Sequence, residues 1–101
     1  MSAARLAPRT RRDLLEAVGW ILADNPPAAR ALRDSVAEAA ERLGRHPELG
    51  AIRTALADPP VRFLVLTGFP YVIVYDSGQK PPLILRVLHG ARDLPDLLPD
   101  L

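Results

Sequence analysis

The side chains best suited to chemistry stand close together near the end of the chain. Arg86, His89, Arg92 and Asp93 follow one another in a short run that begins as an apolar stretch. Histidine has an ordinary pKa of ~6.5 and can exchange protons near neutral pH. Arginine has no accessible neutral form, so it stabilises phosphate charge but is a poor proton shuttle. This run is therefore a candidate site for acid–base chemistry or phosphate binding.

Each of these residues also has a structural interpretation. A charged Arg86 in an apolar strand needs a carboxylate, because an unpaired buried charge costs several kcal/mol. We expect its partner to be Asp93, Glu48 or a carboxylate of another protein. His89 more commonly satisfies a backbone group at a strand end than acts as an acid or base, and Arg92 and Asp93 can form an ion pair.

Composition limits the classes of function. A chain of 101 residues indicates a single domain spanning residues 1–101. All thirteen basic residues but Lys80 are arginine, yet the net charge is only +1, so we expect no direct sequence-specific DNA binding. Without cysteine and with two histidines, we expect no metal and no cofactor. No apolar run reaches ~18 residues and no signal peptide is visible, which favours the cytoplasm over a membrane.

Two amphipathic helices are predicted in the first half of the chain. The first runs roughly from Pro8 to Asp24, and Asn25-Pro26 ends it and begins the next, with Asn25 as the cap. We expect Gly44 to end the second helix. The buried stripe of the first helix is predicted to be Leu14, Leu15, Val18, Ile21 and Leu22, and that of the second Ala28, Leu32, Val36, Ala39 and Leu43.

Three apolar stretches in the second half predict an antiparallel sheet. They are Val61–Thr67, Tyr71–Asp76 and Leu83–Leu88, separated by Gly68-Phe69-Pro70 and by the turn at 77–82. A short strand within Ala3–Ala7 is expected beside them. The connection at 45–60 is long, and Ile52–Ala57 within it can form a helical turn.

Apolar residues on both faces of these strands predict a binding partner. Two helices can cover one face only, and monomers rarely expose a large apolar patch. We expect a partner on the other face, although the N-terminal segment and the C-terminal tail can instead fold over it. The tail repeats leucine at 94, 97, 98 and 101, which predicts either a short docking helix or a segment packed on its own sheet.

The order of motifs resembles the RelE/ParE superfamily of toxins from type II toxin–antitoxin systems. The matching pieces are Pro8 with Asp13-Leu14, Trp20-Ile21 before Asp24-Asn25-Pro26, the loop His46-Pro47-Glu48-Leu49-Gly50, Phe69-Pro70-Tyr71 with Tyr75, and Leu85–Asp93. The last piece is close to the signature RVLHgaRD of the ParE branch. The resemblance implies an α+β fold in which an N-terminal strand and a two-helix hairpin pack on a small antiparallel sheet.

The resemblance also implies a function. ParE-like toxins inhibit DNA gyrase by binding and are neutralised by a tightly bound antitoxin, so gyrase and an antitoxin are the expected partners. RelE-like toxins instead cleave mRNA on the ribosome without a metal. Their lysines have no counterpart here outside Lys80, and Gly90-Ala91 stands where the nucleases place a tyrosine. A third alternative is a module that binds an antitoxin but is not toxic.

The candidate residues follow from these alternatives. No residue is assigned to catalysis under the gyrase interpretation. The nuclease alternative would use Arg62, Arg86, His89 and Arg92, with Arg53 from the loop. The expected partner-binding residues are Trp20, Leu64, Leu66, Arg86, Arg92, Leu94, Leu97 and Leu98. Trp20 lies opposite the sheet-facing stripe, and we expect it to pack against the second helix rather than to stay exposed.

Overall fold

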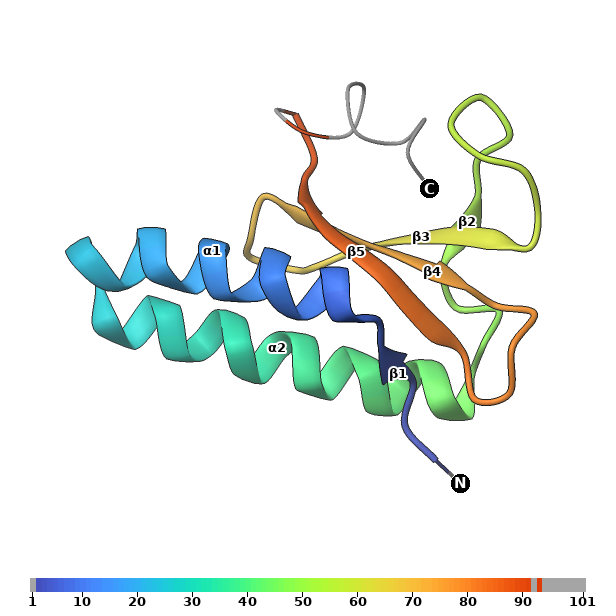
Figure 1. Ribbon diagram of the computed structural model, residues 1–101, viewed down its shortest axis with the longest axis horizontal. Coiled ribbons are helices and arrows are strands. Elements are labelled where there is room, and N and C mark those ends of the chain that lie inside the picture. The colour runs from blue at the N-terminus through green and yellow to red at the C-terminus, as the bar shows by residue number, and fades with distance from the viewer. Residues whose placement is uncertain (1, 92, 94–101) are drawn as a thin grey trace.

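A helical hairpin packs on one face of a five-stranded sheet (Figure 1). The computed structural model describes residues 2–91 and 93. The elements are β1 (Arg5–Leu6), α1 (Pro8–Asp24), α2 (Pro26–Arg45), β2 (Ala51–Ile52), β3 (Val61–Val65), β4 (Tyr71–Asp76) and β5 (Leu83–His89). The predicted α+β class is confirmed. Neither helix within the described residues is long and apolar enough to span a membrane.

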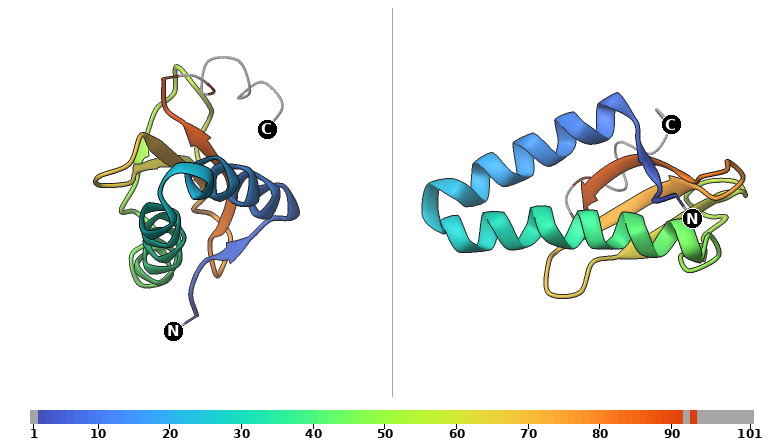
Figure 2. Two further views of the ribbon diagram at one scale, coloured as in Figure 1. Left: turned by 90° about the vertical axis from the view of Figure 1, so that its left-hand side faces the viewer. Right: turned by 90° about the horizontal axis from the view of Figure 1, so that it is seen from below.

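The hairpin forms where the sequence places its boundaries. α1 begins with proline at its first position and ends at Asp24, and the Asn25 side chain accepts a hydrogen bond from the Ala28 N–H at 3.2 Å. This contact caps α2 as predicted. The view from below in Figure 2 shows the two helices running antiparallel from this junction. Four residues of the predicted stripe of α2 are buried, namely Leu32, Val36, Ala39 and Leu43, whereas Ala28 is only half-buried. Ala29 and Ala40 are buried beside them.

Gly44 does not end α2, which continues to Arg45. Its role is close packing, because the Ala4 N–H donates to the Ala40 carbonyl at 2.8 Å and brings the N-terminal segment against the helix. A Cβ at position 44 would lie 2.9 Å from the Ala3 Cα and would overlap the Ser2 carbonyl oxygen. Only glycine leaves room for this contact.

The buried stripe of α1 is narrower than predicted. Leu14, Val18 and Ile21 pack against the core, but Leu15 is 74% exposed and Leu22 is 52% exposed. The helix instead buries Thr10 and Ala17, whose small side chains let it approach the sheet closely. The apolar arc of α1 is wider than the surface beneath it, so its outer flank faces solvent.

The sheet has the order β1-β5-β4-β3-β2. The predicted antiparallel meander of β3, β4 and β5 is confirmed, although β3 ends at Val65 rather than Thr67. β1 pairs with β5 in parallel, with Arg5 opposite Leu83 and Leu6 opposite Ile84, so the sheet is mixed rather than antiparallel. β2 was not predicted. It pairs with β3 through Ala51 and Ile52. The helical turn expected at Ile52–Ala57 begins one residue later, where the Ala57 N–H donates to the Arg53 carbonyl at 3.1 Å.

The second face of the sheet is covered, which corrects the expectation of an open apolar face. Phe63, Val72, Val74 and Leu88 are buried there, and Leu56 and Ala57 of the loop between β2 and β3 pack on them. In Figure 1 this yellow-green loop lies on the side of the sheet opposite the helices. These loop residues therefore cover part of the face on which a partner was expected. The predicted docking role of the tail lies outside the described residues.

Replacing Gly44 with alanine should destabilise the fold by about 1–2 kcal/mol. Overpacking against backbone atoms costs about 1–3 kcal/mol, and the better helix propensity of alanine returns only about 0.5–1 kcal/mol. Gly19 is the matched control on α1, because a Cβ there meets nothing within 4 Å. Gly19→Ala should therefore raise the free energy of unfolding by about 0.5–1 kcal/mol. Urea denaturation of both variants measures the difference, and equal effects would contradict this packing role.

Candidate functional site

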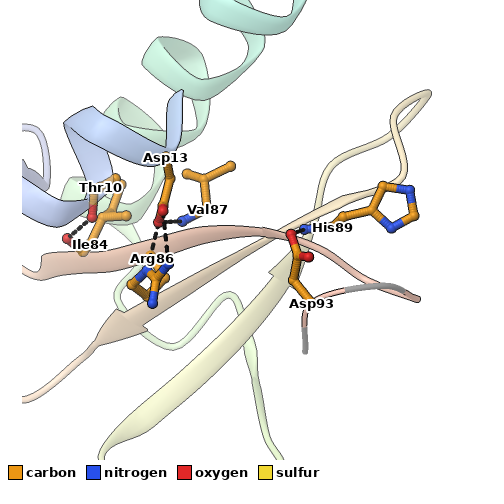
Figure 3. A network of polar contacts seen from close by, with 7 residues as sticks. All are labelled: Thr10, Asp13, Ile84, Arg86, Val87, His89 and Asp93. Atoms are coloured by element: carbon orange, nitrogen blue, oxygen red, sulfur yellow. Dashed lines mark hydrogen bonds and ion pairs between the residues drawn. The ribbon is translucent and has the colours of Figure 1, made fainter. Parts of the chain in front are cut away.

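An ion pair between Asp13 of α1 and Arg86 of β5 stands at the centre of the site (Figure 3). Arg86 donates from Nε to Oδ2 at 2.7 Å and from Nη2 to Oδ1 at 2.8 Å. The two side chains are only 6% and 11% exposed. A bidentate arginine–carboxylate pair is short, directional and shielded from water, so it fixes the position of α1 on β5.

Asp13 also completes the backbone pairing of β5. β1 pairs only with Leu83 and Ile84 among the described residues, so β5 leaves an edge beyond them. The Val87 N–H donates to Asp13 Oδ2 at 3.1 Å, and the buried Thr10 hydroxyl donates to the Ile84 carbonyl at 2.7 Å. Figure 3 shows both contacts reaching from the same turns of α1. Asp13 thus takes the place of a neighbouring strand at Val87, whereas Thr10 adds a second donor to the Ile84 carbonyl, which already accepts the Ala7 N–H at 2.9 Å.

This geometry corrects the expected partner of Arg86. Among the described residues, the carboxylate it binds is that of Asp13 rather than Asp93 or Glu48. Asp13 was not predicted as a site residue, although it falls within the opening pattern of the resemblance described above. The available signal was indirect: Arg86 in an apolar strand required a buried acid, and Asp13 is the one acidic residue before Glu16.

His89 lies at the end of β5, opposite Tyr71. Its ring meets the Tyr71 ring edge to face, with centroids 5.7 Å apart and an interplanar angle of 77°. The backbone N–H of His89 donates to Asp93 Oδ2 at 3.2 Å, and the Asp93 N–H donates to the His89 carbonyl at 2.9 Å. Asp93 therefore closes the strand end. The expected ion pair between Arg92 and Asp93 cannot be placed, because Arg92 lies outside the described residues.

Arg62 holds the loop that carries the His46–Gly50 motif. Its Nη1 donates to the Gly50 carbonyl at 2.9 Å and to the Glu48 carbonyl at 3.3 Å, and its Nε donates to Ser77 Oγ at 3.3 Å. Every one of these acceptors belongs to the chain itself. Arg62 acts here as a clamp between the loop and the sheet.

Tyr75 provides the second anchor of the same loop. Its hydroxyl donates to the Pro47 carbonyl and accepts from the Gly50 N–H, both at 2.7 Å. Burial raises the pKa of Tyr75 above 10.0, more than the Gly50 hydrogen bond and the Arg62 charge lower it. Gly50 is required, since a Cβ there would lie 2.7 Å from the tyrosine ring. The family's loop motif is thus explained by packing around one buried tyrosine.

The nuclease candidates do not form one cluster in the described part of the chain. Arg62 lies on β3 and Arg86 on β5, with β4 between them. Two inter-strand spacings, roughly 10 Å, therefore separate their backbones. Arg53 lies over the Phe63 ring, 5.9 Å from its centroid, where it covers the second core. Arg92 lies outside the described residues. No group of three potential metal-ligating side chains occurs among residues 2–91 and 93.

The expected partner-binding residues divide between surface and core. Trp20 is 77% exposed, so the expectation that it packs against α2 was wrong. Leu66 is 4% exposed and Leu64 packs against the same core, so both lie within the fold beside α2. Arg86 is engaged by Asp13. Arg92, Leu94, Leu97 and Leu98 lie outside the described residues.

A small pocket adjoins the ion pair. It has a volume of about 150 Å³ and lies between α1 and the ends of β4 and β5. Asp13, Glu16 and Trp20 line it from the helix, and Tyr71, Arg86 and Asp93 line it from the sheet side. The pocket therefore brings an exposed indole beside several charged groups.

Comparisons with known proteins agree with this geometry. Residues 4–94 match the family model described as the ParE toxin of type II toxin–antitoxin system, parDE. The chain is 30% identical over 90 residues to Toxin RelE3 of Caulobacter vibrioides, covering 89% of this chain and 96% of that protein. A solved chain of the chromosomal ParDE TA system from P. aeruginosa has the same fold, with a TM-score of 0.72 and 22% identity. That match covers 88% of this chain and 96% of the other.

Breaking the buried ion pair should be strongly destabilising. Asp13→Leu leaves the Arg86 guanidinium buried without its carboxylate, which costs about 3–5 kcal/mol. The double variant Asp13→Leu with Arg86→Met removes both charges and should recover most of this loss. Urea denaturation at pH 7 measures both. A double variant as unstable as the single one would show that the ion pair is not the source of the effect.

Tyr75→Phe should lower stability by about 1–3 kcal/mol at neutral pH, because the Gly50 N–H and the Pro47 carbonyl lose their partner. Since the pKa of Tyr75 is raised in the folded state, the unfolded chain loses this proton first as the pH rises. The stability that Tyr75 contributes is complete below about pH 10 and is lost as the pH rises through the folded pKa. The difference between wild type and variant should shrink above pH 10. A constant difference in alkaline unfolding curves would refute the assignment.

Proposed function

This chain belongs to the ParE toxin family of type II toxin–antitoxin systems, and we propose that it inhibits DNA gyrase by binding and is neutralised by a tightly bound antitoxin. The observation that carries the proposal is that two arginines bind acceptors of the chain itself. Arg86 is held by Asp13 and Arg62 by loop carbonyls, so both serve the fold rather than a substrate phosphate. A toxin whose Arg86 and Arg62 are engaged within its own fold must act through its outer surface, in the cytoplasm where both partners would be found.

The outer flank of α1 supports a protein partner. Leu15 and Trp20 are each more than 70% exposed, and Leu22 is 52% exposed. Gly19 and Ala23 lie between them and line a shallow hollow with Leu15 and Trp20. Large apolar side chains around small residues are the pattern that a partner helix buries. We assign this flank to the antitoxin.

The nuclease alternative rests on two observations. The relative from Caulobacter vibrioides is named Toxin RelE3, and His89 lies beside Tyr71 with Asp93 bonded to its backbone. These residues bring an imidazole, a phenol and a carboxylate to the place where the start of β4 pairs with the end of β5. Groups of these types transfer protons. This alternative needs the imidazole itself to react.

Induction of the gene without its partner tests the proposed function. A gyrase inhibitor should cause DNA damage and filamentation, and loss of supercoiling activity should be seen with purified gyrase. Co-expression of the neighbouring antitoxin should restore growth. Rapid translational arrest with cut transcripts would instead support the nuclease, and normal growth would support a non-toxic antitoxin-binding module.

His89→Ala should leave growth inhibition largely intact. Loss of one strand-end imidazole from a binding protein costs at most about one net hydrogen bond, or roughly tenfold in affinity. Loss of a general acid or base would lower a cleavage rate by about 10²–10⁴-fold. Titrated induction of wild type and variant, with supercoiling and transcript cleavage followed in parallel, separates the two. Abolished cleavage with unaltered supercoiling would move this chain to the nuclease branch.

A further inference from the structure

The positive charge of the chain is concentrated in its first twelve residues. Residues 1–12 contain four arginines and no acidic residue, whereas residues 13–101 contain nine basic and twelve acidic side chains. The one ion pair among the described residues joins Asp13 to Arg86, so no described carboxylate holds any of these arginines. We call the group the N-terminal arginine patch, and its members, all exposed, are Arg5, Arg9, Arg11 and Arg12.

The position of this patch is unfavourable for helix stability. Arg9, Arg11 and Arg12 lie at the start of α1, where the helix macrodipole is positive and acidic residues would be stabilising. The first turn contains no acidic residue and no side-chain cap. α2 shows the opposite arrangement, with Arg42 and Arg45 in its last turn, where positive charge is favourable. The charges at the start of α1 are therefore not explained by helix stability.

The patch is a surface of charge without apolar walls. Figure 2 shows the start of α1 beside β1, at the end of the hairpin away from the junction with α2. None of the four arginines lines the pocket beside Asp13 or the hollow beside Trp20. Arg5 makes one side-chain hydrogen bond within the described residues, to Gln79 Oε1 at 3.3 Å. The ligand that suits such a surface is one that binds through charge alone.

The spread of the charges indicates a polyanion. The Cα atoms of Arg5 and Arg12 are at most roughly 17 Å apart, because three extended residues reach ~10 Å and four helical residues rise ~6 Å. A single phosphate group is too small to contact side chains spread over this length. Duplex DNA presents about ten phosphate charges along it, one per ~1.7 Å of helix axis.

We propose that the N-terminal arginine patch binds the phosphate backbone of duplex DNA without reading the base sequence. The guanidinium groups make the contacts, because their planar fork bonds phosphate oxygens in pairs. The choice of DNA over RNA rests on the proposed function, since DNA gyrase acts on duplex DNA. An acidic protein segment fits less well, because protein interfaces are anchored by buried apolar or aromatic side chains and all four members of the patch are arginine.

The double variant Arg9→Gln with Arg12→Gln tests this binding. Arg30→Gln with Arg33→Gln is the matched control, because it removes the same charge from the first half of α2. Fluorescence anisotropy with a labelled duplex of about 20 base pairs should show log K falling against log salt with a slope of about −3 to −4 for the wild type. The Arg9 and Arg12 variant should bind at least about tenfold more weakly, with the slope reduced by about 2, and the control should stay within about threefold of wild type.

Urea denaturation separates loss of binding from loss of the fold. Removing charges that oppose the macrodipole should leave the unfolding midpoint unchanged or raise it. A readout on the wild-type chain covers a variant that fails to fold: the Nε–H resonances of Arg9 and Arg12 should shift when the duplex is added, and that of Arg30 should not. Equal losses of affinity in the two double variants would indicate diffuse attraction and overturn the inference. Tighter binding to single-stranded RNA or to poly-glutamate of equal charge would overturn it as well.

Supercoiling assays with purified gyrase separate this binding from the proposed function. Inhibition of gyrase by a chain that does not bind the duplex would overturn the inference and leave the proposed function standing. Binding of the duplex through Arg9 and Arg12 without inhibition of gyrase would support the inference and remove the proposed function.

Discussion

The uncovered edge of β5 is the constraint on which the arrangement of the helices depends. β5 is central to the core, yet its neighbour β1 reaches only two of its residues. Buried backbone groups must find partners, and an open strand edge invites aggregation. Asp13 meets this need at the Val87 N–H from the first turns of α1, and the Thr10 hydroxyl adds a second donor to the Ile84 carbonyl. The position of α1, and through the hairpin that of α2, follows from this edge.

Asp13 serves two needs with one carboxylate. It accepts the Val87 N–H and also neutralises Arg86, a charge that the same strand carries inward. A buried ion pair adds little net stability, because desolvation of both ions offsets their attraction. Its contribution is to the specificity of packing, because a shift of α1 along β5 would separate Asp13 from both Arg86 and the Val87 N–H. The pair thus specifies one register of helix on strand, and with it the direction in which Trp20 points.

Local patterns predicted the elements well, whereas contacts between distant residues were not predictable. The bounds of α1 and the cap at Asn25 depend on neighbouring residues, so periodicity and proline position were sufficient. Asp13 and Arg86 are 73 positions apart, and no spacing rule joins them. β2 contains two residues, too few for any alternation to be visible, whereas β1, which is equally short, lies within the strand expected at Ala3–Ala7. Leu15 looked buried because the apolar arc of α1 is wider than the surface that receives it.

The contrast between the arginines bound within the fold and the side chains that face solvent also bears on mechanism. A metal-independent nuclease needs cationic groups that face a substrate phosphate, where they can stabilise charge as it develops. Here Arg86 and Arg62 instead face a carboxylate and carbonyl oxygens of their own chain. Several of the large side chains that face outward are instead apolar, among them Leu15 and Trp20 on α1 and Val65 at the end of β3. Such groups gain free energy by being covered, not by reacting. Such a surface is therefore better suited to contact with another protein than to proton transfer.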